Sequence, residues 1–129
     1  MEKPRLLVID DEPALAEFVA TVASECGFDP ILSEGFEAFR AAVRETKPDM
    51  VALDLGMPGM DGVELLRFLA EEDSRATVLI ISGFDRRVLE SAFRLGEALG
   101  LRMLGPLEKP VRFHDLERVF TQLRSSFVP

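Results

Sequence analysis

The sequence has little of several features that mark particular classes of protein. Its 129 residues include one cysteine, so the chain cannot form an internal disulfide or a cysteine zinc cluster. Acidic residues outnumber basic ones by 23 to 15, for a net charge of -8, so no basic field attracts nucleic acid or an anionic membrane. No apolar run reaches the roughly 18 residues of a membrane span, and the first residues lack a signal-peptide core. We therefore expect a cytoplasmic protein that binds neither nucleic acid nor membranes directly.

What the chain does contain is a regular alternation of two patterns. Three short runs are aliphatic on successive residues, which is typical of strands buried on both faces: Leu6–Ile9, Met50–Leu53 and Val78–Ile81. Two weaker strand candidates, 28–33 and 101–107, contain Pro30 and Pro106. Proline cannot donate to a strand ladder, so these two strands are expected at the sheet edges or to end there.

Apolar residues at helical spacing fill the segments between these runs. One helix is expected from Pro13 to Gly27, and further helices are expected around 36–43, 63–69, 89–99 and 116–123. Strands that alternate with helices predict a parallel sheet with right-handed crossovers and helices on both faces. We therefore expect an α/β fold of (βα)5 type, a doubly wound five-stranded parallel sheet. The length fits one domain, residues 1–129, with a core of about 5–123.

Polar residues follow the predicted strands where each strand ends. Asp10 and Asp11 follow the first run, Asp54 follows the third strand, Ser82 follows the fourth and Lys109 follows the fifth. Ligands in sheets of this kind bind at the carboxyl ends of the strands, at the point where strand order reverses. The five side chains are therefore expected to converge on one edge of the sheet.

The chemistry of these residue types is consistent with phosphoryl transfer. Three carboxylates held together repel one another unless a cation neutralises them, and oxygen ligands on a compact site suit Mg²⁺. A carboxylate beside such an ion can act as a nucleophile, and a lysine can pair with phosphate oxygens. Glu12, directly after the aspartate pair, is assigned only to the start of the following helix.

Four short motifs in this order and spacing resemble the receiver domain of two-component response regulators, which has the flavodoxin-like fold of the chemotaxis regulator. The matching segments are the aspartate pair at 10–11, "LDLGMPGMDG" at 53–62, "ISG" at 81–83 and "KP" at 109–110. The resemblance covers residues 5 to about 123. It implies a phosphoacceptor signalling domain rather than an enzyme in the usual sense, partnered by a sensor histidine kinase or phosphotransfer protein.

The resemblance also implies a role for each matching residue. Asp54 would accept the phosphoryl group, and Asp11, Asp54 and the backbone carbonyl of Gly56 would bind Mg²⁺. Asp10 would act on the ion mostly through water. Ser82 and Lys109 would contact the phosphoryl group, and the peptide bond before Pro110 would be cis.

The chain departs from the family pattern at Pro106. Most receivers carry an aromatic residue three positions before the lysine, and it swings inward on phosphorylation. This chain has no tyrosine and places a proline there, which cannot make such a swing. We predict that its output surface differs from the common one. The long segment before Lys109 also resembles receivers attached to EAL-type phosphodiesterase domains, so such a domain is a possible effector, and homodimerisation is possible too.

Three other readings of these residues stay open at this point. The acidic run at 10–12 could be a solvated turn that caps the first helix. The chain could be a degenerate receiver that only binds a partner. It could also be a phosphohydrolase of the haloacid-dehalogenase class, although that class would have a second carboxylate two residues after the nucleophile, where this chain has Gly56.

Overall fold

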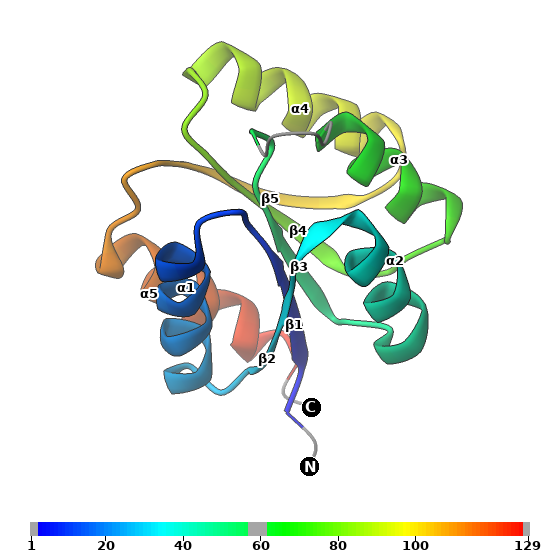
Figure 1. The fold of residues 1–129 in the computed structure, drawn as a ribbon. Helices are drawn as coiled ribbons and strands as arrows, with labels where there is room; N and C mark the ends of the chain where they lie inside the picture. Colours follow the sequence, from blue (N-terminus) through cyan, green and yellow to red (C-terminus); the bar gives the residue numbers. More distant parts are fainter. Residues whose placement is uncertain (1–2, 57–61, 128–129) are drawn as a thin grey trace.

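A computed structural model describes residues 3–56 and 62–127, in which five strands and five helices alternate along the chain (Figure 1). The strands are β1 (Arg5–Ile9), β2 (Asp29–Ser33), β3 (Met50–Leu53), β4 (Thr77–Ser82) and β5 (Arg102–Glu108). The helices are α1 (Pro13–Glu25), α2 (Gly35–Thr46), α3 (Gly62–Glu71), α4 (Arg86–Ala98) and α5 (Phe113–Ser125). The predicted alternation is confirmed.

All neighbouring strands pair in parallel, in the order β2-β1-β3-β4-β5. The chain runs from β1 outward to β2 and then returns past β1 to begin β3, so strand order reverses between β1 and β3. This is the doubly wound, flavodoxin-like order, and its switch point lies at the carboxyl ends of β1 and β3. The expected fold class is confirmed.

Helices cover both faces of the sheet and create two apolar layers (Figure 1). Successive residues of a strand face opposite sides, so Leu7 and Ile9 of β1 pack toward α2, α3 and α4. Leu6 and Val8 pack toward α1 and α5. Because both faces of β1 and β3 are covered, β3 is apolar throughout and β1 is apolar after Arg5, as the continuous aliphatic runs predicted.

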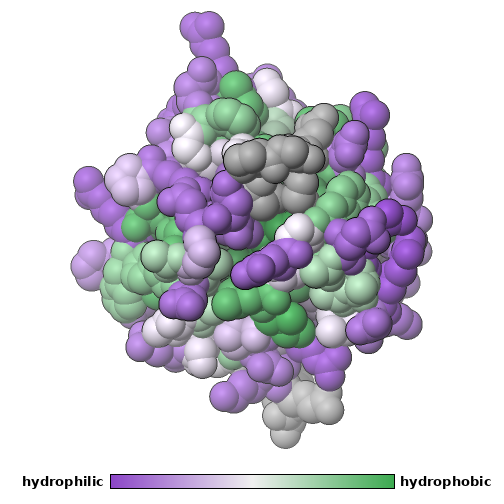
Figure 2. Space-filling view, in the orientation of Figure 1, coloured by the Kyte–Doolittle hydropathy of each residue, from purple (hydrophilic) through white to green (hydrophobic). Residues whose placement is uncertain are grey.

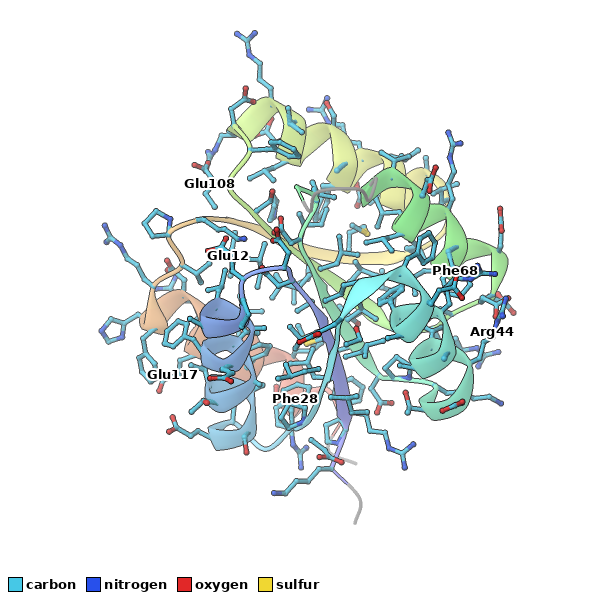
Figure 3. All side chains as sticks on the ribbon, in the orientation of Figure 1. Glu12, Phe28, Arg44, Phe68, Glu108 and Glu117 are labelled. Carbon is cyan, nitrogen blue, oxygen red and sulfur yellow. The ribbon has the colours of Figure 1, made fainter. Side chains whose placement is uncertain are left out.

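Phenylalanines fill both layers. On the α1–α5 side, the rings of Phe28 and Phe120 lie 5.5 Å apart between centroids. The Phe127 ring packs edge-on against Phe28, so packing continues beyond the expected core end at residue 123. On the other side, Phe68 of α3 packs against Phe39 of α2, with Arg44 over its ring (Figure 3).

Both prolines predicted at sheet edges lie there, Pro30 in β2 and Pro106 in β5. In β5 the pairing with β4 shifts register, because Leu104 pairs with Leu79 while Leu107 pairs with Ile81. Gly105 and Pro106 therefore lie opposite the single residue Ile80, so β5 has one extra residue here and forms a bulge. Gly105 has φ of +87°, and a Cβ there would lie 2.9 Å from the Leu79 side chain, so this position requires glycine.

The surface is mainly hydrophilic on the face shown in Figure 2, with hydrophobic side chains visible in smaller areas between the polar ones. Among the described residues, no helix combines the length and apolar character that crossing a membrane requires.

Candidate functional site

The polar residues expected at the strand ends do meet at one edge of the sheet. Strand-like backbone pairing continues one step past the strands, since Asp54 N–H donates to Ile9 O at 3.1 Å and Lys109 N–H donates to Ser82 O at 2.9 Å. These bonds fix Asp54 and Lys109 at the carboxyl edge of the sheet. A cavity of about 290 Å³ opens there, and its lining includes Asp11, Asp54, Ser82 and Lys109.

The Lys109 ammonium is the centre of this cluster. Its Nζ lies 2.9 Å from Asp54 Oδ2 and 3.4 Å from Asp10 Oδ2. The side chains of Asp10 and Asp54 are 6% and 4% exposed, so both carboxylates lie on the buried side of the lysine. One cation therefore bridges the carboxylates that follow β1 and β3.

Asp54 and Ser82 are buried polar residues held by nearby backbone groups. Asp54 Oδ1 accepts a hydrogen bond from Gly56 N–H at 2.9 Å, while Oδ2 accepts from Lys109. Ser82 is fully buried, and its Oγ accepts from Phe84 N–H at 3.4 Å. A buried carboxylate is costly unless it is paired, and here each Asp54 oxygen has a partner. The two hydrogen bonds together fix the orientation of the Asp54 side chain.

Glu12, which we predicted only as the start of the first helix, has a further contact in the site. Glu12 is the N-cap residue of α1, but its side chain makes no capping hydrogen bond. Its Oε1 instead lies 2.7 Å from Lys109 Nζ, which is the shortest ion pair of that lysine among the described residues. The reading of residues 10–12 as a capping turn is therefore wrong. The signal that could have found this role was the third carboxylate of the acidic run.

Burial and charge shift two of the ionisable groups. Burial raises the pKa of Asp10, and the nearby Asp54 carboxylate adds to the rise, against the opposing effects of the Glu12 N–H and Lys109. Burial alone would lower the pKa of Lys109. Its hydrogen bonds to Glu12 and Asp54 outweigh that effect, so the Lys109 pKa is raised and the side chain is cationic at neutral pH.

The acidic side chains fit a hard divalent cation. Asp10, Asp11, Glu12 and Asp54 each place one carboxylate oxygen so that the four atoms lie within 4.8 Å of one another. Asp11 and Glu12 are exposed, so the cluster is open to solvent on one side. An oxygen-only donor set with an open side suits Mg²⁺, which retains water ligands.

Two further expectations concern segments beside the site. The Lys109–Pro110 peptide bond is cis, as the resemblance implied, and the Gly105–Pro106 bond is cis as well. Of the "LDLGMPGMDG" segment, residues 57–61 lie outside the described residues.

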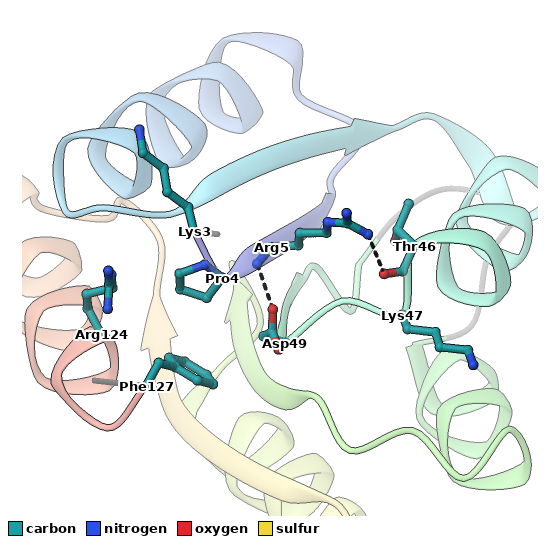
Figure 4. A pocket seen from close by; sticks show the side chains of 8 residues that line it. All are labelled: Lys3, Pro4, Arg5, Thr46, Lys47, Asp49, Arg124 and Phe127. Carbon is teal, nitrogen blue, oxygen red and sulfur yellow. Dashed lines mark hydrogen bonds between the residues drawn. The ribbon is translucent and has the colours of Figure 1, made fainter. Parts of the chain in front are cut away.

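A second cavity, of about 380 Å³, lies at the opposite, amino-terminal edge of the sheet and is lined by four cationic side chains (Figure 4). These residues are Lys3, Arg5, Lys47 and Arg124. Arg5 donates to Thr46 O at the end of α2, and Arg124 donates to Gly27 O just beyond α1. Asp49 accepts from the backbone N–H of Arg5 at 2.8 Å. Cations next to helix carboxyl ends are favourable for stability, so the two arginines have a structural role here.

Comparisons with known proteins agree on one family. The family model described as the response regulator receiver domain matches residues 6–121. The DNA-binding response regulator MtrA of Mycolicibacterium smegmatis is 39% identical over 84 residues, which cover 64% of this chain and 36% of that protein. The positive alginate biosynthesis regulatory protein of Pseudomonas aeruginosa is 33% identical over 115 residues, which cover 86% of this chain and 43% of that protein. The chain thus spans less than half the length of these curated relatives.

A solved structure extends the similarity over nearly the whole chain. A response regulator from Colwellia psychrerythraea has a TM-score of 0.78 and 32% sequence identity. The match covers 97% of this chain and 99% of that one.

Proposed function

Because the chain belongs to the response regulator receiver domain family, we propose that Asp54 accepts a phosphoryl group and thereby switches partner interactions. Receiver domains are phosphoacceptor signalling domains rather than enzymes in the usual sense. They interact with histidine kinases or phosphotransfer proteins and bind Mg²⁺ at an acidic pocket. Residues 1–129 would form one such domain, acting in the cytoplasm. The observation that carries the proposal is a buried Asp54 carboxylate with both oxygens held, one by Lys109 and one by Gly56 N–H.

In the proposed reaction, an Asp54 carboxylate oxygen attacks the phosphorus of a phosphohistidine on the partner. The new oxygen–phosphorus bond forms as the phosphorus–nitrogen bond breaks, and the released histidine nitrogen takes up a proton. Such transfers depend mainly on positioning and charge stabilisation. Lys109 would pair with the negative phosphoryl oxygens. Ser82 Oγ accepts from Phe84 N–H, so its own O–H is the donor we assign to a phosphoryl oxygen.

Mg²⁺ would be held by this chain's own oxygens. Asp11 and Asp54 would contact the ion directly together with the backbone carbonyl of Gly56, and Asp10 would act through water. The four-carboxylate cluster supports this assignment. When bound, the ion supplies positive charge that neutralises the carboxylates and the phosphoryl oxygens.

Labelling with a small phosphodonor tests the proposal. The protein is incubated with Mg²⁺ and acetyl phosphate, and the intact mass is measured. We expect one phosphoryl adduct in the wild type, none in Asp54→Asn, and an unchanged adduct in Asp49→Asn, the matched control at the opposite edge. No adduct from acetyl phosphate or from a histidine-kinase extract would favour the binding-only receiver. Steady turnover of small phosphoesters would favour a hydrolase.

The output route is also proposed to differ from the common one. Pro106 lies half-buried in the β5 bulge, and its ring has no rotamer swing to report the state of Asp54. Chemical shifts with and without a beryllofluoride phosphate mimic test this idea. Shifts confined to the face formed by α4, β5 and α5 would contradict it.

The effector is unidentified, and none of the relatives described above supports an EAL-type domain. We also propose that the domain can form a homodimer.

A further inference from the structure

We propose that Glu12 is a positioning residue, which holds the Lys109 ammonium beside the acceptor from the solvent side. This inference rests on the proposed role of Asp54. Glu12 belongs to the acidic cluster, but it is neither the phosphoacceptor nor one of the four groups to which Mg²⁺ binding is assigned above.

The geometry accounts for all three donors of the ammonium. A lysine ammonium has three N–H groups. Within residues 3–56 and 62–127, Lys109 Nζ has three carboxylate partners, at 2.7 Å to Glu12, 2.9 Å to Asp54 and 3.4 Å to Asp10. Glu12 is the shortest of these contacts. A point charge on a flexible four-carbon stem is thus held from three directions.

Glu12 is the exposed member of the trio. Its side chain is 61% exposed, whereas Asp10 and Asp54 are almost completely buried. Asp10 and Asp54 therefore hold the ammonium from within, and Glu12 holds it at the mouth of the cavity. Without Glu12, water would replace a charged partner on that side, and the lysine could turn outward.

The backbone of Glu12 is itself fixed, so the residue can act as an anchor. Its N–H donates to Asp10 Oδ1 at 2.9 Å, and its C=O accepts from Ala16 N–H at 2.9 Å in the first turn of α1. Figure 3 shows Glu12 where β1 leads into α1. Its carboxylate reaches a residue 97 positions away in the sequence, so it links the start of α1 to the end of β5.

Removal of the Glu12 charge should therefore slow the transfer step without weakening donor binding. We expect Glu12→Gln to lower the maximal rate of labelling by acetyl phosphate about two- to fivefold, the range for loss of one exposed ion pair. The donor concentration for half-maximal rate should not rise, because the variant removes a negative charge from the mouth of the cavity. Glu17→Gln, on α1 and exposed, changes net charge equally and should match the wild type.

A spectroscopic measurement separates positioning from a general structural effect. The chain has only three lysines, so nitrogen-15 spectra of the side-chain ammonium groups contain three signals. We expect the Lys109 ammonium to exchange with water slowly in the wild type and faster in Glu12→Gln. Lys3 and Lys47, both exposed, serve as internal controls and should not change.

The outcomes distinguish this inference from the proposed function. If the wild type takes up no phosphoryl group, the role of Asp54 fails, while the ammonium spectra still test the contact itself. If the wild type is labelled but Glu12→Gln has the same maximal rate, the positioning role is wrong. Unchanged water exchange at Lys109 in Glu12→Gln would overturn it as well.

Discussion

The two edges of the sheet both collect charge, but they use it differently. At the amino-terminal edge, Arg5 and Arg124 donate to backbone carbonyls near helix ends, and Asp49 accepts from a backbone N–H. At the carboxyl edge, oxygens of four carboxylates lie within 4.8 Å of one another beside an open cavity. Lys109 is the cation that contacts three of them among the described residues.

The difference shows how charge marks a site. A charged side chain that hydrogen-bonds to a backbone group stabilises the fold locally. Like charges that face one another raise the free energy of the folded state, so their neutralisation is left to a ligand. Of these two cavities, the one at the amino-terminal edge is larger, but its two arginines and Asp49 already have backbone partners. It is therefore the less suited of the two to reaction or ligand binding.

Removal of the central cation should produce the largest change in stability. Lys109→Gln leaves Asp10 and Asp54 buried together without a positive partner, and we expect it to lower the free energy of unfolding by about 2–3 kcal/mol without Mg²⁺. Lys47→Gln removes an exposed cation at the opposite edge and should stay within about 0.5 kcal/mol of wild type. Urea unfolding of the two variants measures both. Equal losses in the free energy of unfolding would mean that the cation at the carboxyl edge is no more important for stability than the one at the amino-terminal edge.

A change of shape at the amino-terminal edge should affect folding but not labelling. Gly27 has φ of +96°, and a Cβ there would lie 2.9 Å from Arg124 Nε. We expect Gly27→Ala to lower the free energy of unfolding by about 1–2 kcal/mol because an L-residue is strained in this region. Its rate of labelling by acetyl phosphate, measured well below the melting temperature, should equal that of the wild type. A slower rate would show that the two edges are coupled.

The pH dependence of stability should reveal the smallest effect. Because the pKa of Asp10 is raised above its ordinary 3.8, the folded state holds this proton more tightly than the unfolded chain does. The contribution of Asp10 therefore favours folding at low pH and is lost as the pH rises from about 3.8 through the raised value.

Without Mg²⁺, Asp10→Asn should flatten this part of the stability profile and stabilise the protein slightly at pH 7. Asp49→Asn should leave that part of the profile in place. Melting temperatures from pH 4 to 8 measure both variants. A profile unchanged by Asp10→Asn would contradict the assigned shift.

Much of the fold was predictable because the local sequence pattern of each element agrees with the position of that element in the sheet. The aliphatic run Met50–Leu53 is a strand whose two faces are both covered, and a run of that kind has few other solutions. Pro30 and Pro106 could be placed in the two outer strands of the sheet, since proline lacks the N–H that an inner strand needs. The strand-end rule then brought Asp54 and Lys109 together.

The contact of Glu12 with Lys109 and the β5 bulge could not be predicted from the sequence, because both depend on tertiary structure. Whether Glu12 faces solvent or Lys109 depends on how α1 begins relative to the end of β5, which is a tertiary relation that no local pattern encodes. The bulge depends likewise on how Gly105 fits against Leu79 of the neighbouring strand. Helical or strand periodicity gives the type of an element, not the register between distant elements.

The prolines of the two outer strands have a consequence for how copies of this protein can meet. An outer strand with a full row of N–H groups is a template on which a strand of another molecule can be added. Pro30 removes a donor from β2, and Pro106 removes one from β5 where the bulge also interrupts the strand. Neither end of the sheet is therefore suited to growth from one molecule into the next, so self-association through the helical faces is favoured over strand addition.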